Sequence, residues 1–555
     1  MRMRHVVIIG AGVGGLTAAL RLAAQGVEVT VVESAAAPGG KMREVMAGGV
    51  PIDSGPTVLT MRWVFDELAA DVGLSLNDYV HCQPTQTLAR HGWSDGARLD
   101  LFADLEQSVA AIEAFSGARD AQAYRAFAAR AQSVHTTLKD SFIHASRPNL
   151  FQLSRRIGFS RWREQMRLSP YSTLADALAG TFRDPRLRQL FARYATYCGS
   201  SPYAAPATLM LVAHVEREGV WLIEGGMQRL AEGLVAMAQR FGAAFLYNRR
   251  AARILVEGGR ACGVELADGE RIAADAILMH GDVSALGAGL LGPDVTGAVA
   301  MIPPKARFLS AITWSMQART QGFPLLRHNV FFSDVYRAEF DDILIHGRAP
   351  RAPTVYVCAQ DRGDQSPEPG AQSQSERLFC LINAPANGDG APLKPSDLQS
   401  CEDATFRHLD RCGLKVTPLD TARVVTTPAD FARMFPGSGG ALYGPAQHGW
   451  MAAFARPGAR TRLPGLYLAG GGVHPGSGVP MAALSGRQAA LSIMADLPSV
   501  PASTARSRPA ATPGGMSMRS ATTGNMASPS SPSSAASSRP GTPGPDARTR
   551  STTAR

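Results

Sequence analysis

Residues 5–33 read HVVIIGAGVGGLTAALRLAAQGVEVTVVE. The first five residues form an apolar run, which is typical of a strand buried inside a parallel sheet. A glycine-rich turn follows at residues 10–15, and a helix is predicted over residues 16–25, where Gly26 ends it. A second strand is predicted over residues 27–32 and is followed by Glu33. This order of strand, turn, helix and strand predicts an α/β fold that begins with a βαβ unit.

The glycines of this turn occupy the positions that a bound dinucleotide requires. Gly10 permits the tight turn, Gly12 lets the backbone approach a pyrophosphate, and Gly15 lets the helix pack closely on the strand. Gly14 lies with them at the start of the helix, whose free N–H groups and partial positive charge favour phosphate. Glu33, 23 positions after Gly10, can accept hydrogen bonds from ribose hydroxyls. These spacings predict a dinucleotide site.

A second glycine motif follows six residues after the glutamate and ends with Gly40 and Lys41. An acid followed by this motif resembles the second signature of the FAD-dependent amine oxidase and phytoene desaturase superfamily. The resemblance implies FAD as the cofactor, with Lys41 as a cation for its pyrophosphate. It also implies that the segment DSGPTV, with Gly55, Thr57 and Val58, passes near the flavin ring.

The C-terminal part of the sequence contributes a third glycine-rich corner. Residues 463–481 read LPGLYLAGGGVHPGSGVPM and precede a helix predicted over 481–497. They resemble the closing FAD motif of carotenoid desaturases, in which the helix N-terminus would point at the flavin and stabilise its reduced form. His474 is interpreted as shaping the turn, with catalysis as the alternative. The cofactor-binding residues implied here are Gly470, Gly471, Val479 and Met481.

The resemblance to this superfamily implies that residues 221–279 hold the adenine end of the same site. A helix is expected over 228–240, a hairpin over 253–266 and a returning strand over 274–279. The resemblance implies contacts from Ala251 and Asp282. The chain departs from the usual pattern here, since it has Ala251 for a valine and HGD at residues 280–282 for Asn-Ala-Asp.

These segments predict an α/β two-domain flavoprotein. A discontinuous, Rossmann-like FAD-binding domain is expected from residues 1–85, 218–300 and 455–498. A substrate and membrane-contact domain with a mixed sheet and helices is expected from residues 86–217 and 301–454. Residues 499–555 are predicted to be a disordered tail, because from residue 501 onward they contain no Leu, Ile, Val, Phe, Tyr or Trp.

Longer strings extend the resemblance to nearly the whole chain up to residue 497. Diagnostic examples are DPRLRQLF at 184–191, RYATYCGS at 193–200 and PTVYVCAQDR at 353–362. They are similar to the bacterial 1-hydroxycarotenoid 3,4-desaturases, relatives of phytoene desaturase. The resemblance implies an FAD-dependent enzyme that introduces a C=C bond at the 3,4 position of a 1-hydroxy or 1-methoxy acyclic carotenoid by hydride transfer to flavin.

A carotenoid is almost entirely hydrocarbon, so its site should be an apolar tunnel with few polar groups. The sequence contains no recognisable Ser-His-Asp constellation, metal-ligand cluster or carboxylate pair, so we predict no metal and identify no catalytic residue. The substrate hydroxyl would need a partner, and Tyr197, Ser200 and His328 are open candidates. The electron acceptor is not indicated.

Charge and cysteine content bear on partners and location. Six of the ten net positive charges lie within residues 501–555, so a nucleic-acid partner is not indicated. Seven cysteines without a C-x-x-C pair, and no transmembrane segment, favour a cytoplasmic protein.

Because a carotenoid resides in a bilayer, peripheral association with the inner membrane is expected. The segment 151–168, basic and aromatic, could lie on the membrane or pack as an ordinary amphipathic helix.

Two classes of alternative remain open at this point. One is another enzyme of the same fold, either a phytoene desaturase or a flavin amine oxidase acting on a polar substrate. The other is a prenyl- or lipid-binding chaperone, because the Rab escort and GDP-dissociation inhibitor proteins share a related fold without flavin catalysis. The complete dinucleotide motif argues against the chaperone, and analysis of products separates the enzymes.

Overall fold

The computed structural model describes residues 4–148, 172–307, 309–364, 375–445 and 452–497. By its internal contacts, the chain from residue 1 to residue 498 forms one compact unit. Two sequence predictions, the basic segment 151–168 and the disordered tail 499–555, lie outside the described residues.

A five-stranded parallel sheet contains the βαβ unit expected from the sequence. Its strand order is β19-β13-β1-β2-β9. The strands are β1 (His5–Ile9), β2 (Glu28–Val32), β9 (Ala244–Leu246), β13 (Ala276–Met279) and β19 (Leu466–Leu468). Three segments far apart in the sequence thus meet in one sheet, as the glycine motifs had suggested.

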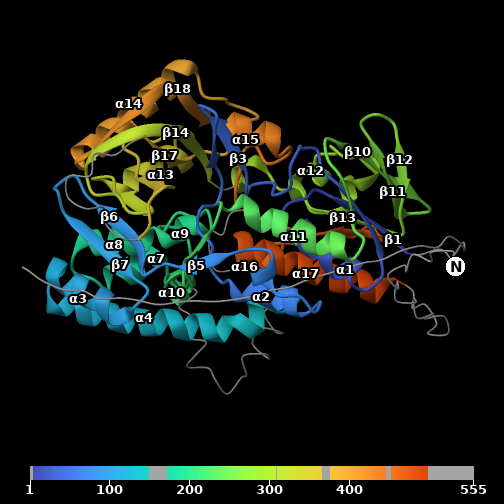
Figure 1. Ribbon diagram of the computed structural model, residues 1–555, viewed down its shortest axis with the longest axis horizontal. Coiled ribbons are helices and arrows are strands. Elements are labelled where there is room, and N and C mark those ends of the chain that lie inside the picture. Colours follow the sequence, from blue (N-terminus) through green and yellow to red (C-terminus); the bar gives the residue numbers. More distant parts are fainter. Residues whose placement is uncertain (1–3, 149–171, 308, 365–374, 446–451, 498–555) are drawn as a thin grey trace, which may run out of the picture. The chain divides into compact units, whose positions relative to one another are not determined.

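Three helices pack together beside this sheet, namely α1 (Val13–Ala23), α11 (Gln228–Arg240) and α17 (Val479–Asp496), and α1 contacts the other two (Figure 1). The backbones of α1 and α17 are very close, because a Cβ added to Gly486 would lie 2.1 Å from the carbonyl oxygen of Gly14. The bounds of α11 match the prediction, whereas α17 begins two residues early because Pro480 fits the first turn.

The expected hairpin forms part of a separate three-stranded antiparallel sheet. It consists of β10 (Ala251–Glu257), β11 (Arg260–Leu266) and β12 (Arg271–Ala273). Apolar side chains of β10 and β11, such as Ile254 and Val264, join a core with Ile277 of the parallel sheet. The hairpin therefore packs onto the nucleotide-binding half of the fold.

A seven-stranded mixed sheet forms the other half, in the order β18-β14-β17-β16-β15-β6-β7. Only β15 and β6 run parallel; the remaining neighbours are antiparallel. Its strands are β6 (Thr87–Gly92), β7 (Arg98–Phe102), β14 (Ser310–Gly322), β15 (His328–Phe331), β16 (Val355–Ala359), β17 (Glu376–Ala384) and β18 (Leu414–Thr426). This is the mixed sheet that the sequence predicted.

Two short strand pairs lie outside the larger sheets, and one of them connects the halves. The hairpin β3 (Glu44–Ala47) and β4 (Val50–Asp53) belongs to the first sequence segment, yet its Ala47 and Ile52 pack on Cys358 and Phe379 of the large sheet. The strands β5 (Cys82–Pro84) and β8 (Trp221–Ile223) pair with each other. The division of the chain into two domains stays a prediction, since contacts cross it at this hairpin.

Helices complete the half that contains the large sheet. The long helix α4 (Ala118–Leu138) continues into a π-helical turn over Lys139–Ile143. The other α-helices of the described chain, of which α2 and α12 pack in the nucleotide-binding half, are α2 (Trp63–Ala70), α3 (Leu105–Ser116), α7 (Leu174–Ala179), α8 (Pro185–Ala192), α9 (Tyr194–Tyr197), α10 (Leu211–Glu218), α12 (Val283–Gly287), α13 (Tyr336–Leu344), α14 (Pro395–Arg411), α15 (Pro428–Met434) and α16 (Ala452–Ala455). In the described ranges, no helix has the length and apolar character needed to cross a bilayer.

Candidate functional site

A cavity of about 900 Å³ extends from the glycine-rich turns into the half with the large sheet. Fourteen of the sixteen predicted cofactor-binding residues line it: Gly10, Gly12, Glu33, Gly40, Lys41, Gly55, Thr57, Val58, Ala251, Asp282, Gly470, Gly471, Val479 and Met481. The other two, Gly14 and Gly15, lie behind the wall in the first turn of α1. The structure thus brings all four sequence motifs to one place.

The first glycine turn leaves no room for a side chain. Gly10 has a φ of +103°, and a Cβ there would lie 2.3 Å from the carbonyl oxygen of His280. The second glycine motif is bound to this turn, because the Gly39 N–H donates to the Ala11 carbonyl at 2.9 Å. The two glycine motifs therefore form one backbone cradle at the cavity wall, which fits the close approach of a pyrophosphate.

Glu33 lies at the end of β2 and is buried at the cavity wall. Its two carboxylate oxygens accept from the backbone N–H groups of Ala11 (2.7 Å) and Ala35 (2.8 Å). The Ser34 hydroxyl also donates to Oε1 at 3.2 Å, so these bonds fix the carboxylate in place while Oε2 keeps a lone pair for a further donor. The position fits the predicted role of ribose acceptor.

Lys41 lines the cavity, but its bonds differ from the expected ones. Its Nζ donates to the carbonyl oxygen of Leu442 at 2.7 Å and lies 5.3 Å from the ring centre of Phe435. Burial lowers the pKa of Lys41. In the structure the lysine thus joins the two halves of the protein, and its charge also acts on His280 of the cradle, so its role as the phosphate cation stays a prediction.

The segment that follows is attached to both halves. The Asp53 carboxylate accepts from the Met227 N–H at the start of α11 (3.0 Å), and a Cβ on Gly55 would lie 1.9 Å from the Lys41 carbonyl oxygen. Thr57 shares a hydrogen bond of 2.7 Å with the hydroxyl of Tyr356, which bonds in turn to Nδ1 of His328 at 2.7 Å. The segment implied to face the flavin is therefore held rigidly.

The closing glycine corner is fixed by a buried arginine that sequence reasoning missed. The guanidinium of Arg456 donates to the carbonyl oxygens of Gly471 and, at 3.1 Å, Tyr443. Burial lowers the pKa of Arg456 to about 10. His474 does not line the cavity; its Nε2 lies 3.0 Å from the carbonyl oxygens of Phe142 and Ala145, so it connects the corner to the end of the π-helical turn.

His280 stands where the resemblance to the flavoprotein superfamily implied asparagine. Its Nε2 accepts a hydrogen bond from the Gly14 N–H at 3.0 Å, and its ring fills the space beside Gly12 and Gly15. Burial, and after it the charge of Lys41, lowers the pKa of His280 to about 4. A neutral imidazole is therefore part of the cradle, and only the departure from the usual motif could have indicated it.

Beyond the cradle the cavity is mainly apolar. Its wall includes Leu138, Phe142, Val212, Val330, Phe379 and Leu381. This part fits the apolar tunnel that the sequence predicted. Among the three hydroxyl-partner candidates, Tyr197 lines the cavity, His328 lies behind Tyr356, and Ser200 is fully buried away from the wall.

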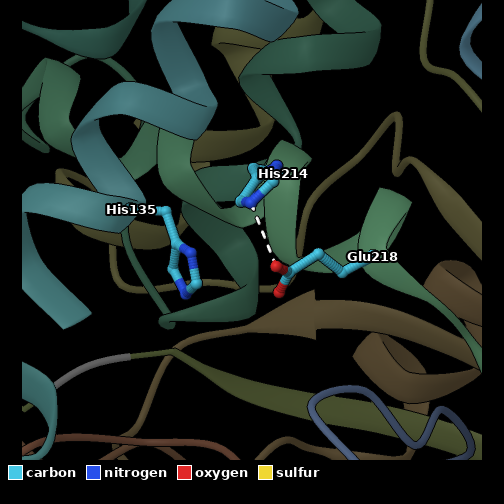
Figure 2. A group of neighbouring side chains, drawn as sticks. All are labelled: His135, His214 and Glu218. Atoms are coloured by element: carbon cyan, nitrogen blue, oxygen red, sulfur yellow. Dashed lines mark ion pairs between the residues drawn. The ribbon is translucent and has the colours of Figure 1, made fainter.

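One cluster outside the cavity offers metal-ligating atoms. Figure 2 shows His135 from α4 beside His214 and Glu218 from α10, and Nε2 of His214 lies 3.2 Å from Oε1 of Glu218. Positive charges adjoin it, because Arg217 lies 3.3 Å from Nδ1 of His214, and Lys139 contributes after burial to lowering the pKa of His135. We interpret the cluster as a polar contact between two helices rather than a metal centre.

Comparison with known proteins places this geometry in a family. The flavin containing amine oxidoreductase family matches residues 13–494. The chain belongs to this family. It is also 51% identical to a hydroxyneurosporene desaturase of Rubrivivax gelatinosus over 95% of this chain and 99% of that protein. A 1-hydroxycarotenoid 3,4-desaturase of a Flavobacterium species is 30% identical over 87% of this chain and 98% of that protein.

The family membership confirms the flavin cofactor and the relationship to carotenoid desaturases that the sequence motifs predicted. Among solved structures, an oxidoreductase from Methanosarcina mazei aligns with a TM-score of 0.55 over 88% of this chain and all of that chain. Its sequence is only 17% identical, so it supports the fold alone. The cradle, Glu33 and the C-terminal corner are the residues that would hold FAD in this family member.

Proposed function

We propose that this flavoprotein desaturates a 1-hydroxy or 1-methoxy acyclic carotenoid at its 3,4 bond. The observation that carries the proposal is the continuity of the cavity. One space joins a backbone cradle suited to FAD with an apolar wall that suits a polyene. The likeness to a hydroxyneurosporene desaturase over 95% of this chain supports the same choice of substrate.

The reaction removes one hydrogen from each of two neighbouring carbons and leaves a C=C bond. When bound, FAD supplies the two-electron acceptor that this oxidation requires. The protein contributes position and exclusion of water. Val212, Val330 and Leu381 would hold the carotenoid by apolar contact, and the Thr57–Tyr356 hydrogen bond would keep the flavin-facing segment in place.

A side-by-side assay in liposomes tests the proposal. Purified holoprotein is given a 1-hydroxycarotenoid in one tube and phytoene in the other, and products are resolved by chromatography and absorbance. A red-shifted product two hydrogens lighter, formed only from the hydroxylated substrate, is expected. Conversion of phytoene alone would contradict the substrate assignment, and no conversion with either would favour an amine oxidase or a lipid-binding chaperone.

We further propose that the protein takes its substrate from a membrane surface and associates with it peripherally. Leu290 and Met434 support this, since both line the cavity and are also exposed to solvent. The five arginines at positions 155, 156, 161, 163 and 167 are candidates for contact with anionic lipid. Replacing them with glutamine should weaken sedimentation with anionic liposomes, and unchanged sedimentation would rule out that role for them.

A further inference from the structure

A buried charged cluster interrupts the apolar wall of the cavity. It consists of Arg193, Tyr194, Tyr197 and Glu216, and we call it the Arg193–Glu216 cluster. The Arg193 side chain donates through one terminal nitrogen to Glu216 (3.4 Å) and through the other to the Tyr197 hydroxyl (2.9 Å). Arg193 and Glu216 are 7% and 2% exposed, and Arg193, Tyr197 and Glu216 line the cavity.

Two tyrosine hydroxyls complete the cluster. Tyr197 donates to Oε1 of Glu216 at 2.7 Å, and Tyr194 donates to Oε2 of the same carboxylate. Burial raises the pKa values of both tyrosines, so they stay protonated as donors. Burial acts against the charge of Arg193, but Tyr197 and Glu216 raise the pKa of Arg193 above its usual value. The cluster is therefore an ion pair held by hydrogen bonds.

Such an ion pair is not explained by stability alone. Taking two charges out of water costs several kcal/mol for each ion, and apolar residues of similar volume often stabilise a fold equally well. Apolar residues do occur in the neighbouring wall, where Leu209, Val212 and Val215 line the cavity. A charged pair among them points to a ligand with one polar end.

The cluster retains hydrogen-bonding capacity. A guanidinium has five N–H donors, and two of its nitrogens make the contacts described above. Among the described residues, Nε of Arg193 has no partner, although this nitrogen is itself buried, and the terminal nitrogens are the ones that contact the other members of the cluster. An alcohol can accept from Arg193 and also donate to Glu216, an ether oxygen can only accept, and a hydrocarbon can do neither. The cluster can therefore distinguish these three kinds of chain end.

The distance along the substrate also agrees with this position. A hydroxyl on C1 is separated from C3 by a single carbon, so its partner must lie close to the flavin-facing segment. Thr57 in that segment bonds to Tyr356. Tyr356 and His328 both interact electrostatically with the cluster. Burial raises the pKa of Tyr356, and Tyr197 raises it further. Burial lowers the pKa of His328, and the charges of Arg327 and Arg193 lower it further.

We propose that the Arg193–Glu216 cluster binds the terminal oxygen of the carotenoid, with Arg193 donating to that oxygen and Glu216 accepting from a hydroxyl. This inference rests on the proposed desaturase function. It explains why the enzyme would prefer a carotenoid with an oxygen at the end of its chain. The side chains act as specificity determinants, because they bind a group that does not itself react.

The test compares three substrates that differ only at C1, with a hydroxyl, a methoxy group or hydrogen. Wild-type holoprotein, Glu216→Gln and the double variant Arg193→Met/Glu216→Gln are assayed for kcat/KM in liposomes and for carotenoid binding by quenching of tryptophan fluorescence. Arg217→Gln is the matched control, since Arg217 lies next to Glu216 on α10 but does not line the cavity. Flavin content and circular dichroism check that each variant is folded.

We expect Glu216→Gln to lose about 10- to 100-fold on the hydroxylated substrate and much less on the methoxy substrate, because only the hydroxyl donates to residue 216. The double variant should lose most of the preference among the three substrates, because only neutral hydrogen-bonding groups remain there, and Arg217→Gln should behave as wild type. Folded variants that keep the wild-type preference would overturn the inference and favour Tyr356 and His328 instead. If the double variant does not fold, Glu216→Gln alone decides. Wild type inactive on every oxygenated substrate would instead refute the desaturase proposal.

Discussion

At the residue scale, the cofactor cradle depends on glycine positions that have no space for a Cβ atom. Gly10 is the clearest case, because its positive φ is strained for any other residue and its missing Cβ faces the His280 carbonyl. Gly26 also has a positive φ of 77°, yet nothing lies within 4 Å of the position of its Cβ. A side chain at Gly26 would therefore cause backbone strain alone, whereas a side chain at Gly10 would cause backbone strain and a steric clash.

Gly10→Ala should give a protein that purifies with little flavin and unfolds more easily. Gly26→Ala should lose about 1 kcal/mol of unfolding free energy through its φ alone and keep its flavin. Flavin absorbance per protein and urea unfolding measure the two effects. Equal flavin content in both variants would show that the cradle tolerates a methyl group at Gly10.

Glu339 makes stability depend on pH. It is buried beside the cavity wall, where its carboxylate accepts from Asn383 (2.8 Å) and from the Thr354 N–H (3.0 Å). Burial raises its pKa from 4.5 to about 7. A carboxyl with a raised folded pKa contributes stability that is complete below the unfolded value and is lost as pH rises through the folded value.

Glu339 should therefore lower the unfolding free energy by about 3 kcal/mol between pH 4.5 and pH 8. Glu339→Gln should reduce the loss of stability over that range, because the amide does not ionise. Urea unfolding at half-unit pH steps measures the difference in slope. Identical slopes for wild type and variant would assign the pH dependence to other groups.

At the scale of elements, the packing of α1 against α17 holds the first and last segments of the nucleotide-binding half together. Gly486→Ala would place a methyl group against the backbone of α1 and should cost about 1–3 kcal/mol of unfolding free energy. Leu491→Ala on the same helix is the control, because Leu491 is half exposed and its loss should cost about 0.5 kcal/mol or less. Thermal melts compare the variants, and equal midpoints would mean that the helices can separate without penalty.

The sequence was most informative where structure is local. The βαβ unit, the hairpin and α11 depend on neighbours in the chain, so periodicity and glycine spacing predicted them. The pairing of β15 with β6 could not be predicted, because about 240 residues separate the strands. The same limit applies to the site. Lys41 binds the Leu442 carbonyl, and Arg193 meets Glu216 from another helix, through contacts that only the folded chain reveals.

At the scale of the whole molecule, the cofactor site is assembled from three distant segments. A ligand that needs all of them binds the folded chain only, so removal of FAD should lower the thermal midpoint. Restoring FAD to one hundred times its Kd should return about 2.7 kcal/mol of unfolding free energy. Melts across a series of FAD concentrations measure this, and a midpoint independent of FAD would contradict the assembled site.

The tail is expected to contribute nothing to folding. A chain ending at Pro498 should keep its flavin and its unfolding free energy within about 0.5 kcal/mol, because residues 501–555 contain no large apolar side chain apart from methionine. Urea unfolding and flavin absorbance of the shortened protein check this. Weaker sedimentation of that protein with anionic liposomes would show that the arginine-rich tail acts as a membrane anchor.

The order of strands in the parallel sheet also bears on synthesis. Strand β1 is synthesised long before β13 and β19, which complete its side of the sheet and begin at residues 276 and 466. Until β13 is made, about halfway along the sequence, the apolar edge of β1 that pairs with it therefore has no native partner and is open to mispairing or aggregation. Insertion of FAD must follow synthesis of the C-terminal glycine corner, so protecting the nascent N-terminal half from aggregation should raise the yield of holoprotein.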